Sequence, residues 1–520
     1  MKRSQSERLI ATQLNNAPTI FAEAILIGIL AGLISVVYRF LLTYAEKAYF
    51  MISSYVHDHM IYLVLWIPIL LVVGFLISLL LKWEPYISGS GIPQVEAEVQ
   101  GRIDMKWWRV LLAKIIGGTL AVFGGLSVGR EGPSIQLGAM IGKGIGKKFR
   151  QTANDIHYLM TCGASAGLAA AFNAPLAGIM FALEEVHKSF NTKAVMSVMC
   201  ASVIADFISR NVFGLAPVLS FTIEEVLPLR YYGWLVVLGL VTGALGVLYN
   251  KLTMTTIAVY KKIPLLQPHQ KVMIPLLISS ILGLYAPILM CGGGAVLTRL
   301  DQPDLMIGAL ILMYLGKLAF SACSFGSGAP GGIFFPLLIL GSLVGAIVGK
   351  AAISLGLPEV YYVNFIIFAM AGYFSAIVRA PITGIVLIAE MSGTLRILLP
   401  MVLTCFISYS LANGLHSEPI YESLLHNLLA KQRKQTPLSD IHKSLVSYVI
   451  AMDAIAAHKK VADLILDQCL IVSVIRGNTE FIPNGETVLH PADQVIVLVN
   501  KDNIIETKEM LRMVFTSDNE

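Results

Sequence analysis

Long apolar runs alternate with short, interrupted ones along most of the chain. Residues 20–42, 61–81 and 232–260 each stay apolar for long enough to cross a bilayer as one helix, which rises about 1.5 Å per residue. The pieces between the second and third runs are cut by Gly, Pro and charge, and they cover about 107–126, 134–146, 157–172, 176–186 and 194–213. Several are shorter than the roughly 17 residues that a crossing needs. Because irregular backbone at membrane depth must be surrounded by protein or water, this pattern predicts helices that end inside the protein.

The second half of the apolar region repeats the first. Pro133, Gly138, Gly142 and Gly146 recur with identical spacing as Pro336, Gly341, Gly345 and Gly349. Further on, Ala174-Pro175, Gly178-Ile179 and Glu184 recur with matching gaps as Ala380-Pro381, Gly384-Ile385 and Glu390. Two patterns in the same order predict a transmembrane domain over 20–428 with repeats at about 20–215 and 230–425. Paired repeats with discontinuous helices favour a binding site at the midplane between the halves, as in many transporters. These residues alone do not say whether the repeats are inverted.

From about residue 430 the pattern changes. Residues 429–443 are basic and polar and contain a proline, which predicts a linker. Strands are predicted at 469–475 and 493–499, with a turn at Gly477-Asn478 and a second strand and turn over 481–485 between them. With helices expected at about 459–468 and 502–513, residues 444–520 are predicted to form a small α+β domain.

Composition agrees with the apolar pattern. Hydrophobic residues make up 56% of the 520 residues and charged residues 14%, which is typical of a polytopic membrane protein. The expected fold class is therefore an all-α multi-pass membrane protein with a small α+β C-terminal domain. Basic residues in the first ten positions favour a retained cytoplasmic tail over 1–19 rather than a signal peptide. The C-terminus is expected in the cytoplasm too.

Charge and cysteine content exclude other classes. A net charge of +5 is small for this length and argues against nucleic-acid binding. The six cysteines show no paired spacing, so neither a disulfide nor a metal site is expected. A membrane enzyme is disfavoured because His157, His187 and His416 lie apart without metal or nucleophile spacing. No cofactor is expected.

The strongest chemical signal is Gly129-Arg130-Glu131-Gly132-Pro133, which lies between apolar stretches. An Arg or Lys at bilayer depth costs about 2.5 to 3.5 kcal/mol on insertion scales, and intramembrane charges in general favour a functional interpretation. Gly and Pro end one helix and start the next, and a helix N-terminus inside the membrane attracts anions. The carboxylate of Glu131 would compete with such an anion and would leave when protonated. The alternative is a buried ion pair at a helix break.

Three further stretches predict helix starts that carry donors. Gly89-Ser90-Gly91-Ile92-Pro93 offers a hydroxyl, and the glycine-rich sequence over 328–336 offers backbone N–H groups with no side chain in the way. Glu418-Pro419-Ile420-Tyr421 offers a phenol. Individually, the glycine-rich stretch is also compatible with a simple turn, and Tyr421 with an interface anchor.

In this order and within repeated halves, these stretches resemble the CLC family of chloride channels and chloride/proton antiporters. The resemblance covers roughly residues 20 to 425, and it rests on GSGIP (89–93), GREGP (129–133) and GGIFFP (331–336). It implies a homodimer in the cell membrane in which each subunit has its own pathway, built from inverted repeats of tilted helices. It also implies that Ser90 and Tyr421 donate hydroxyl hydrogen bonds to chloride and that Ile333 and Phe334 donate backbone N–H groups. Glu131 would be the gating glutamate, and the anion path would be supported by Gly129, Arg130, Gly132 and Lys114.

Selectivity and coupling follow from particular positions. Ser90 resembles the chloride-preferring form of the family. Proton coupling needs a second titratable group that is reachable from the cytoplasm, and Glu185 aligns with the inner proton glutamate of the antiporters, where channels usually have Val. The alternative is that Glu184 and Glu185 only cap a helix at the water boundary. The expected function is chloride/proton exchange, and a passive chloride channel of the same fold is the second candidate.

The C-terminal domain resembles the RCK C-terminal (TrkA-C) domain of potassium-uptake regulators, through IVSVIRG and IPNGETVLHPADQVIVL. Relatives dimerise and some bind a cyclic dinucleotide, so cyclic di-AMP is the expected effector, and a dimer-stabilising tail is the alternative. A cation-transport subunit is disfavoured because the sequence contains no TVGYG-like filter.

Overall fold

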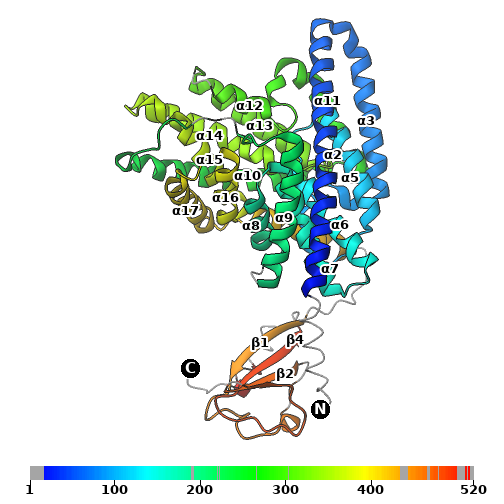
Figure 1. Cartoon of the computed structure of the whole chain (residues 1–520), viewed down its shortest axis with the longest axis vertical. Helices are drawn as coiled ribbons and strands as arrows, with labels where there is room; N and C mark the ends of the chain where they lie inside the picture. The colour runs from blue at the N-terminus through cyan, green and yellow to red at the C-terminus, as the bar shows by residue number, and fades with distance from the viewer. Residues whose placement is uncertain are drawn as a thin grey trace. The chain divides into compact units, whose positions relative to one another are not determined.

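The structure is a computed structural model that describes residues 17–188, 192–219, 221, 223–264, 266–301, 304–433, 443–464, 466, 469–477, 479–500, 510–511 and 513–515. Its internal contacts divide the chain into two compact units, Met1–Leu428 and Leu429–Glu520. The predicted N-terminal tail lies almost entirely outside the described residues. Figure 1 shows helices in the first unit and the strands in the second.

The first unit consists of helices of very different lengths (Figure 1). They are α2 (Ala17–Asp58), α3 (Leu63–Trp83), α4 (Ile92–Val99), α5 (Trp107–Phe123), α6 (Glu131–Lys148), α7 (Ala153–Phe172), α8 (Pro175–Phe181), α9 (Thr192–Phe213), α10 (Gly233–Lys262), α11 (Met273–Tyr285), α12 (Gly294–Leu300), α13 (Ile307–Gly326), α14 (Phe334–Ser354), α15 (Tyr362–Val378), α16 (Pro381–Ser392), α17 (Leu398–Gly414) and α18 (Ile420–Arg433). Within the described residues, seven helical stretches are long and apolar enough to cross a membrane. Most of the others have 17 residues or fewer, as the interrupted pattern predicted, whereas α6 has 18 and α7 has 20.

The repeated sequence patterns correspond to repeated helix pairs. In the first half α6 packs against α7, and in the second half α14 packs against α15. The glycines of α6 let two backbones touch, because a Cβ added to Gly138 would meet the carbonyl oxygen of Gly163 on α7 directly. Gly345 approaches the backbone of Phe365 on α15 in the same way. The repeated small residues therefore set how closely each pair packs.

Gly138→Ala is expected to destabilise the membrane unit by about 3 kcal/mol, the upper end of the usual cost of overpacking, because the added methyl group meets backbone rather than a movable side chain. The measurement is the thermal unfolding and the monodisperse fraction of the detergent-solubilised protein. Gly308→Ala on α13 is the matched control, since its methyl group would meet no atom within 4 Å. Equal losses in both variants would contradict the packing argument.

The two halves meet at a pair of equivalent glycines. Gly129 and Gly332 each stand four residues before the repeated prolines, Pro133 and Pro336. The Gly129 N–H donates to the Gly332 carbonyl (2.6 Å), and the Gly332 N–H donates back to the Gly129 carbonyl (2.8 Å), as an antiparallel bridge. Reciprocal pairing of equivalent residues places a local two-fold axis through the pair. The halves are therefore related by a two-fold rotation at this point, and α6 and α14 both begin beside it.

The second unit contains an antiparallel sheet with the strand order β1-β4-β2-β3. Its strands are β1 (Lys443–Val449), β2 (Cys469–Arg476), β3 (Thr479–Phe481) and β4 (Gln494–Asn500). The buried side chains of Ile471, Val474, Val495 and Val497 form the centre of its core. The predicted strands at 469–475 and 493–499 are confirmed. The second strand, predicted to begin at Phe481, is wrong in its position, because β3 ends at Phe481; the turn predicted by Gly485 is confirmed.

Two other expectations for this unit differ from the structure. The predicted helix over 459–468 is wrong, because the described part of that segment holds only a short 3-10 turn at Val461–Asp463. Its backbone instead pairs with the segment that leads to β4: the Val461 N–H donates to Thr487 and the Ala462 N–H to Gly485. Strand β1 was not predicted. Most of the predicted helix over 502–513 lies outside the described residues. Within that range, residues 510–511 are described and are helical.

An ion pair links β2 to the start of β4. Arg476 donates to Asp493 through Nε (2.8 Å) and Nη2 (2.7 Å), and the His490 N–H donates to the same carboxylate (2.8 Å). Burial by itself raises the pKa of Asp493, but these hydrogen bonds and the charge of Arg476 bring it below its usual value. A lowered folded-state pKa stabilises the fold above the unfolded-state pKa of about 3.9 and loses that contribution as the pH falls through the folded-state value.

Asp493→Ala is therefore expected to speed hydrogen exchange of the β4 amides in the full-length protein by about thirtyfold at pH 7, which corresponds to about 2 kcal/mol for hydrogen bonds to a charged group. The difference from the unmodified protein should shrink as the pH falls below about 4, and it should be smallest below the folded-state pKa, where the carboxyl is protonated in both states. Lys460→Gln is the control, because it breaks an exposed pair with Glu486 (2.6 Å) that is worth little. A thirtyfold effect of the control variant would show that the assay reports surface charge in general.

Candidate functional site

The three glycine-rich motifs meet through backbone hydrogen bonds. The Gly89 N–H donates to the Ala329 carbonyl (3.2 Å), and the Gly331 N–H donates to the Gly89 carbonyl (3.1 Å). Together with the Gly129–Gly332 pair, these bonds join GSGIP and GREGP to opposite sides of GGIFFP. The helices that follow the motifs, α4, α6 and α14, consequently begin at one place, and the free N–H groups of their first turns converge there.

Ser90 and Gly132 touch at this junction. Ser90 is buried, and a Cβ added to Gly132 would lie 2.7 Å from the Ser90 carbonyl oxygen and 3.0 Å from its Cβ. The Ser90 hydroxyl accepts a hydrogen bond from the Ile92 N–H (3.3 Å), so its proton stays available as a donor. Gly132 is thus required for the close approach of GREGP to the serine.

Lys114 stabilises the backbone of the loop that leads to Ser90. Its wholly buried ammonium donates to the carbonyls of Ile87 (2.8 Å) and Gly89 (2.7 Å), immediately before Ser90. Its positive charge therefore acts on an anion through the field and through the loop it holds. Sequence reasoning missed the equivalent residue of the other repeat, Lys317, which donates to the carbonyls of Leu289 and Cys291 (2.9 Å each). The spacing that relates Pro133 to Pro336 also relates the two lysines and is the signal that could have found it.

The Glu131 carboxylate is wholly buried at the same junction. Its Oε1 lies 3.7 Å from Arg130 Nε, and a Cβ on Gly129 would meet its Oε2 at 2.5 Å. The N–H groups of Arg130, Glu131 and Phe335 face it closely enough for electrostatic attraction. Among the described residues, none forms a hydrogen bond of good geometry with either oxygen. The carboxylate is thus held in the field of two helix N-termini without being fixed to a donor, which allows it to exchange places with an anion.

Glu131 also lines a cavity of about 410 Å³, named the Glu131 cavity. Gly129 and Arg130 lie on its wall together with the side chains of Arg39, Glu46 and Asn173. Arg39 donates to Asn173 (3.2 Å) and stacks over the ring of Phe213 (3.9 Å to the centroid). Glu131 therefore faces a polar cavity whose wall carries charges of both signs.

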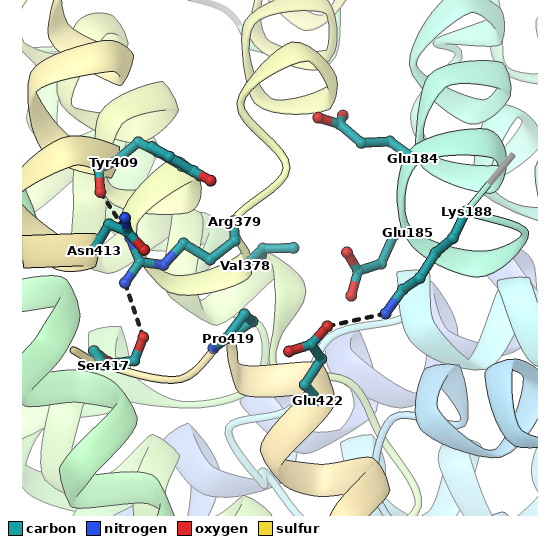
Figure 2. Close-up of a pocket in the computed structure, with 10 residues that line it drawn as sticks. All are labelled: Glu184, Glu185, Lys188, Val378, Arg379, Tyr409, Asn413, Ser417, Pro419 and Glu422. Carbon is teal, nitrogen blue, oxygen red and sulfur yellow. Dashed lines mark hydrogen bonds and ion pairs between the residues drawn. The ribbon is translucent and has the colours of Figure 1, made fainter. Parts of the chain in front are cut away.

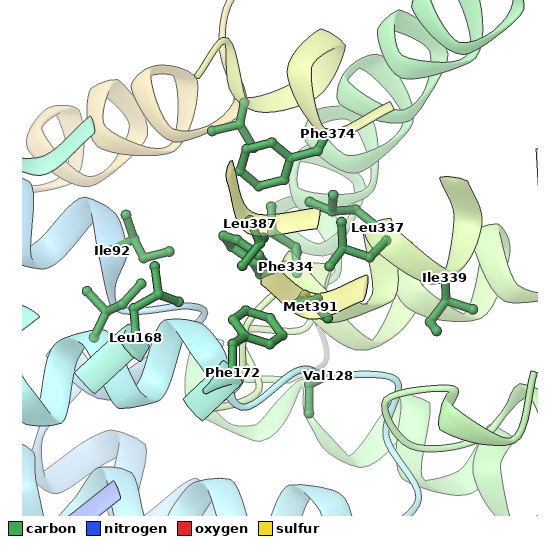
Figure 3. Close-up of a cluster of buried hydrophobic side chains, with 14 of the residues drawn as sticks. Ile92, Val128, Leu168, Phe172, Phe334, Leu337, Ile339, Phe374, Leu387 and Met391 are labelled. Carbon is green, nitrogen blue, oxygen red and sulfur yellow. The ribbon is translucent and has the colours of Figure 1, made fainter. Parts of the chain in front are cut away.

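Aromatic side chains connect the predicted chloride donors of the second half. Figure 3 shows Phe334 among Phe172, Leu387 and Met391. Its ring lies 6.0 Å from that of Phe181, which in turn lies 6.3 Å from that of Tyr421. Ile333 caps α14 and Phe334 is its first residue, so their N–H groups have no acceptor within the helix.

Tyr421 interacts with both candidate proton carriers. It lies in the first turn of α18, is wholly buried, and its hydroxyl has no hydrogen-bond partner among the described residues. Both Glu131 and Glu185 lie close enough to interact with it electrostatically. The structure therefore brings the predicted residues of both repeats to one region.

The neighbouring Glu184 and Glu185 have different environments. Glu184 accepts hydrogen bonds from the Thr383 N–H (2.9 Å) and hydroxyl (2.7 Å) at the start of α16. Its repeat equivalent, Glu390, accepts from the N–H groups of Leu176 (3.1 Å) and Ala177 (2.8 Å) at the start of α8. Each half thus caps a helix of the other. The capping alternative holds for Glu184, whereas Glu185 caps no helix in the described structure.

Glu185 instead points toward a second cavity of about 410 Å³, named the Glu185 cavity (Figure 2). Its side chain is buried, and its Oε1 has no hydrogen-bond partner within the described residues. The wall also holds Lys188, Arg379 and Glu422. Arg379 donates to the carbonyls of Tyr409 (2.7 Å) and Ser417 (2.9 Å). No residue is common to the walls of the two cavities as far as the chain is described, so each carboxylate faces its own.

Comparisons with known proteins agree with this geometry. Residues 69–413 match the family described as "Voltage gated chloride channel", and residues 445–512 match the "TrkA-C domain". The chain is 35% identical over 429 residues to an H(+)/Cl(-) exchange transporter ClcA from Vibrio cholerae, covering 79% of this chain and 90% of the relative. It is 33% identical to that of Salmonella typhimurium, covering 83% of this chain and 93% of the relative.

The solved structure of a slow cyanobacterial Cl-/H+ antiporter superposes with a TM-score of 0.75 at 31% identity, covering 79% of this chain and 98% of the other. A CLC-type fluoride/proton antiporter, 23% identical, has the same fold (TM-score 0.65, covering 78% and 97%). Because the family match covers most of the chain and its motifs meet at one site, the protein belongs to the voltage-gated chloride channel (CLC) family.

Proposed function

We propose that the protein is a chloride/proton antiporter. Glu131 and chloride alternate at the junction of α6 and α14, and Glu185 passes protons between Glu131 and the side of the membrane on which its cavity opens. The observation that carries the proposal is the different use of two adjacent carboxylates: Glu184 is held by Thr383, whereas Glu185 is buried with an oxygen left unpaired beside a cavity. A buried carboxyl without a hydrogen-bond partner can take up and release a proton, whereas the Glu184 carboxylate is occupied as the acceptor of two hydrogen bonds.

Chloride as the anion is supported by the donor set. A spherical monovalent anion needs several modest donors and must be able to leave again. The two hydroxyls of Ser90 and Tyr421 and the N–H groups of Ile333 and Phe334 supply partial charges only. The full positive charge of Lys114 is already engaged by two carbonyls, so it lowers the cost of an anion without clamping it.

The test is flux measurement on the purified protein in liposomes. A chloride gradient imposed without a proton gradient should drive protons uphill in the opposite direction to chloride, and a proton gradient should drive chloride. Chloride flux with no proton movement in either experiment would instead assign the protein as a passive channel, the second candidate.

Two predictions concern assembly and regulation. We propose that the protein is a homodimer and that its C-terminal unit binds cyclic di-AMP, which would alter transport. Mass measurement of the protein in detergent checks the homodimer, and a monomer at the concentrations at which the protein transports would contradict it.

Titration of the full-length protein with cyclic di-AMP checks the regulatory proposal, and an absence of binding or of any change in flux would contradict it.

A further inference from the structure

Lys188 links the two helices that carry the predicted chloride hydroxyls. Its ammonium lies 2.8 Å from Oε1 of Glu96 and 3.2 Å from Oε1 of Glu422. Glu96 belongs to α4, which begins beside Ser90, and Glu422 follows Tyr421 in α18. Figure 2 shows the Lys188 side chain extending beside Glu185 to Glu422 on the wall of the Glu185 cavity. One side chain therefore spans the serine helix and the tyrosine helix at the mouth of this cavity.

The two ion pairs differ in strength. The Glu96 side chain is wholly buried, and its other hydrogen bond comes from Gln100 (3.0 Å) on the same helix. Removing the ammonium from Glu96 would leave a buried charge without a counter-ion, which is strongly unfavourable. The Lys188 and Glu422 side chains are 36% and 44% exposed, so water readily replaces their contact. Lys188 thus stays on α4 and can release α18.

The other charged groups around the cavity show why the Lys188–Glu422 contact is the one that can open. On the cavity wall, Arg379 is engaged by two carbonyls and Glu184 by Thr383. Glu185 faces the same cavity and attracts the Lys188 ammonium electrostatically. In the described structure the cavity therefore holds one carboxylate, Glu185, that can draw the ammonium away from Glu422.

We propose that Lys188 is a positioning residue that acts as a latch between α4 and α18. While it bonds Glu422, it ties the first turn of α18, which carries Tyr421, to α4, which begins beside Ser90. When it releases Glu422, the start of α18 is free to move, and chloride passes between the two hydroxyls toward the Glu185 cavity. The proposal rests on the transport function proposed above and adds a residue that controls its rate.

Locking the latch tests it most directly. The double variant Lys188→Cys/Glu422→Cys in the full-length protein is treated in liposomes with a flexible bifunctional thiol reagent, and the cross-link is counted by mass spectrometry. Chloride turnover of the cross-linked protein should fall by at least about tenfold and recover when a cleavable reagent is reduced. Each single cysteine variant, treated identically, controls for the native cysteines. Normal turnover of the cross-linked protein would overturn the proposal.

Weakening the latch should have the opposite effect. Glu422→Gln breaks only the exposed pair and leaves Lys188 on Glu96, so chloride turnover should rise about two- to fivefold, the effect of an exposed ion pair on a barrier. Asp304→Asn is the matched control, because it breaks an exposed pair with Arg299 (2.6 Å) elsewhere in the same unit and should leave turnover unchanged. Unchanged or slower turnover of Glu422→Gln would contradict the latch. Proton coupling of the unmodified protein is measured alongside, so a failure of the antiport proposal is seen separately from a failure of the latch.

Discussion

Replacing Glu185 by Val is expected to lower proton transport by at least about 100-fold while chloride continues to flow. A positioned acid–base group typically contributes a factor of that size or more to proton transfer, and valine cannot carry a proton. Chloride should persist because the hydroxyl and N–H donors proposed for it lie on other residues. Simultaneous recording of chloride and proton flux in liposomes is the measurement.

Glu184→Gln is the control for this experiment. The two glutamates are adjacent, but Glu184 accepts two hydrogen bonds from Thr383, so the amide should cost about 0.5 to 2 kcal/mol of stability as a weakened helix cap. Its proton-to-chloride ratio should equal that of the unmodified protein. If Glu185→Val kept its coupling, or if Glu184→Gln lost it, Glu185 would not be the proton carrier.

The second large effect is expected at Glu131. Glu131→Gln should abolish proton transport and leave a chloride flux that no longer changes with pH. Glutamine resembles the protonated carboxyl in shape and charge, so it no longer competes as an anion for the field of the α6 and α14 N-termini. It also cannot release a proton to the Glu131 cavity.

The pH dependence separates this role from a purely structural one. Chloride flux through the unmodified protein should change with pH as the Glu131 carboxyl gains or loses its proton, and the flux through Glu131→Gln should be flat. Arg130→Gln is the comparison variant, since it removes the neighbouring charge at 3.7 Å but keeps the carboxyl. It should remain coupled and pH-dependent. A pH-dependent, coupled Glu131→Gln variant would refute the assignment of Glu131 as the gate.

The architecture could be predicted from the sequence at positions where the residue type restricts the backbone to one kind of structure. Glycine at Gly129 and Gly132 and proline at Pro133 mark a helix start in the sequence alone, because each limits the backbone in a known way. The repeats were visible because packing of α6 on α7 requires small residues at fixed positions. The helix limits were less accurate: α2 runs from Ala17 to Asp58, whereas only residues 20–42 were predicted. Hydrophobicity gives the length inside lipid and not the length of the helix.

Contacts between distant segments were not predictable in the same way. Glu184 and Glu390 were recognised as a repeat, but their exchange of caps depends on a two-fold relation in space that a linear sequence does not contain. Lys188 has no sequence signal, because its partners lie 92 residues before it and 234 residues after it. In the C-terminal unit, β1 was missed because Lys443 to Val449 (KSLVSYV) does not alternate polar and apolar residues. It also follows directly on the polar linker, so the start of the strand has no turn signal.

The exchanged caps have a consequence for the separate halves of the gene product. A fragment containing only residues of the first repeat would expose the amides at the start of α8 and leave the Glu184 carboxylate without donors. A fragment of the second repeat would have the complementary defects at α16 and Glu390. Two identical half-length chains arranged around the same axis would satisfy both sets at once. The exchanged caps therefore favour self-association of a single repeat, and fusion of two copies keeps the two repeats together in one chain.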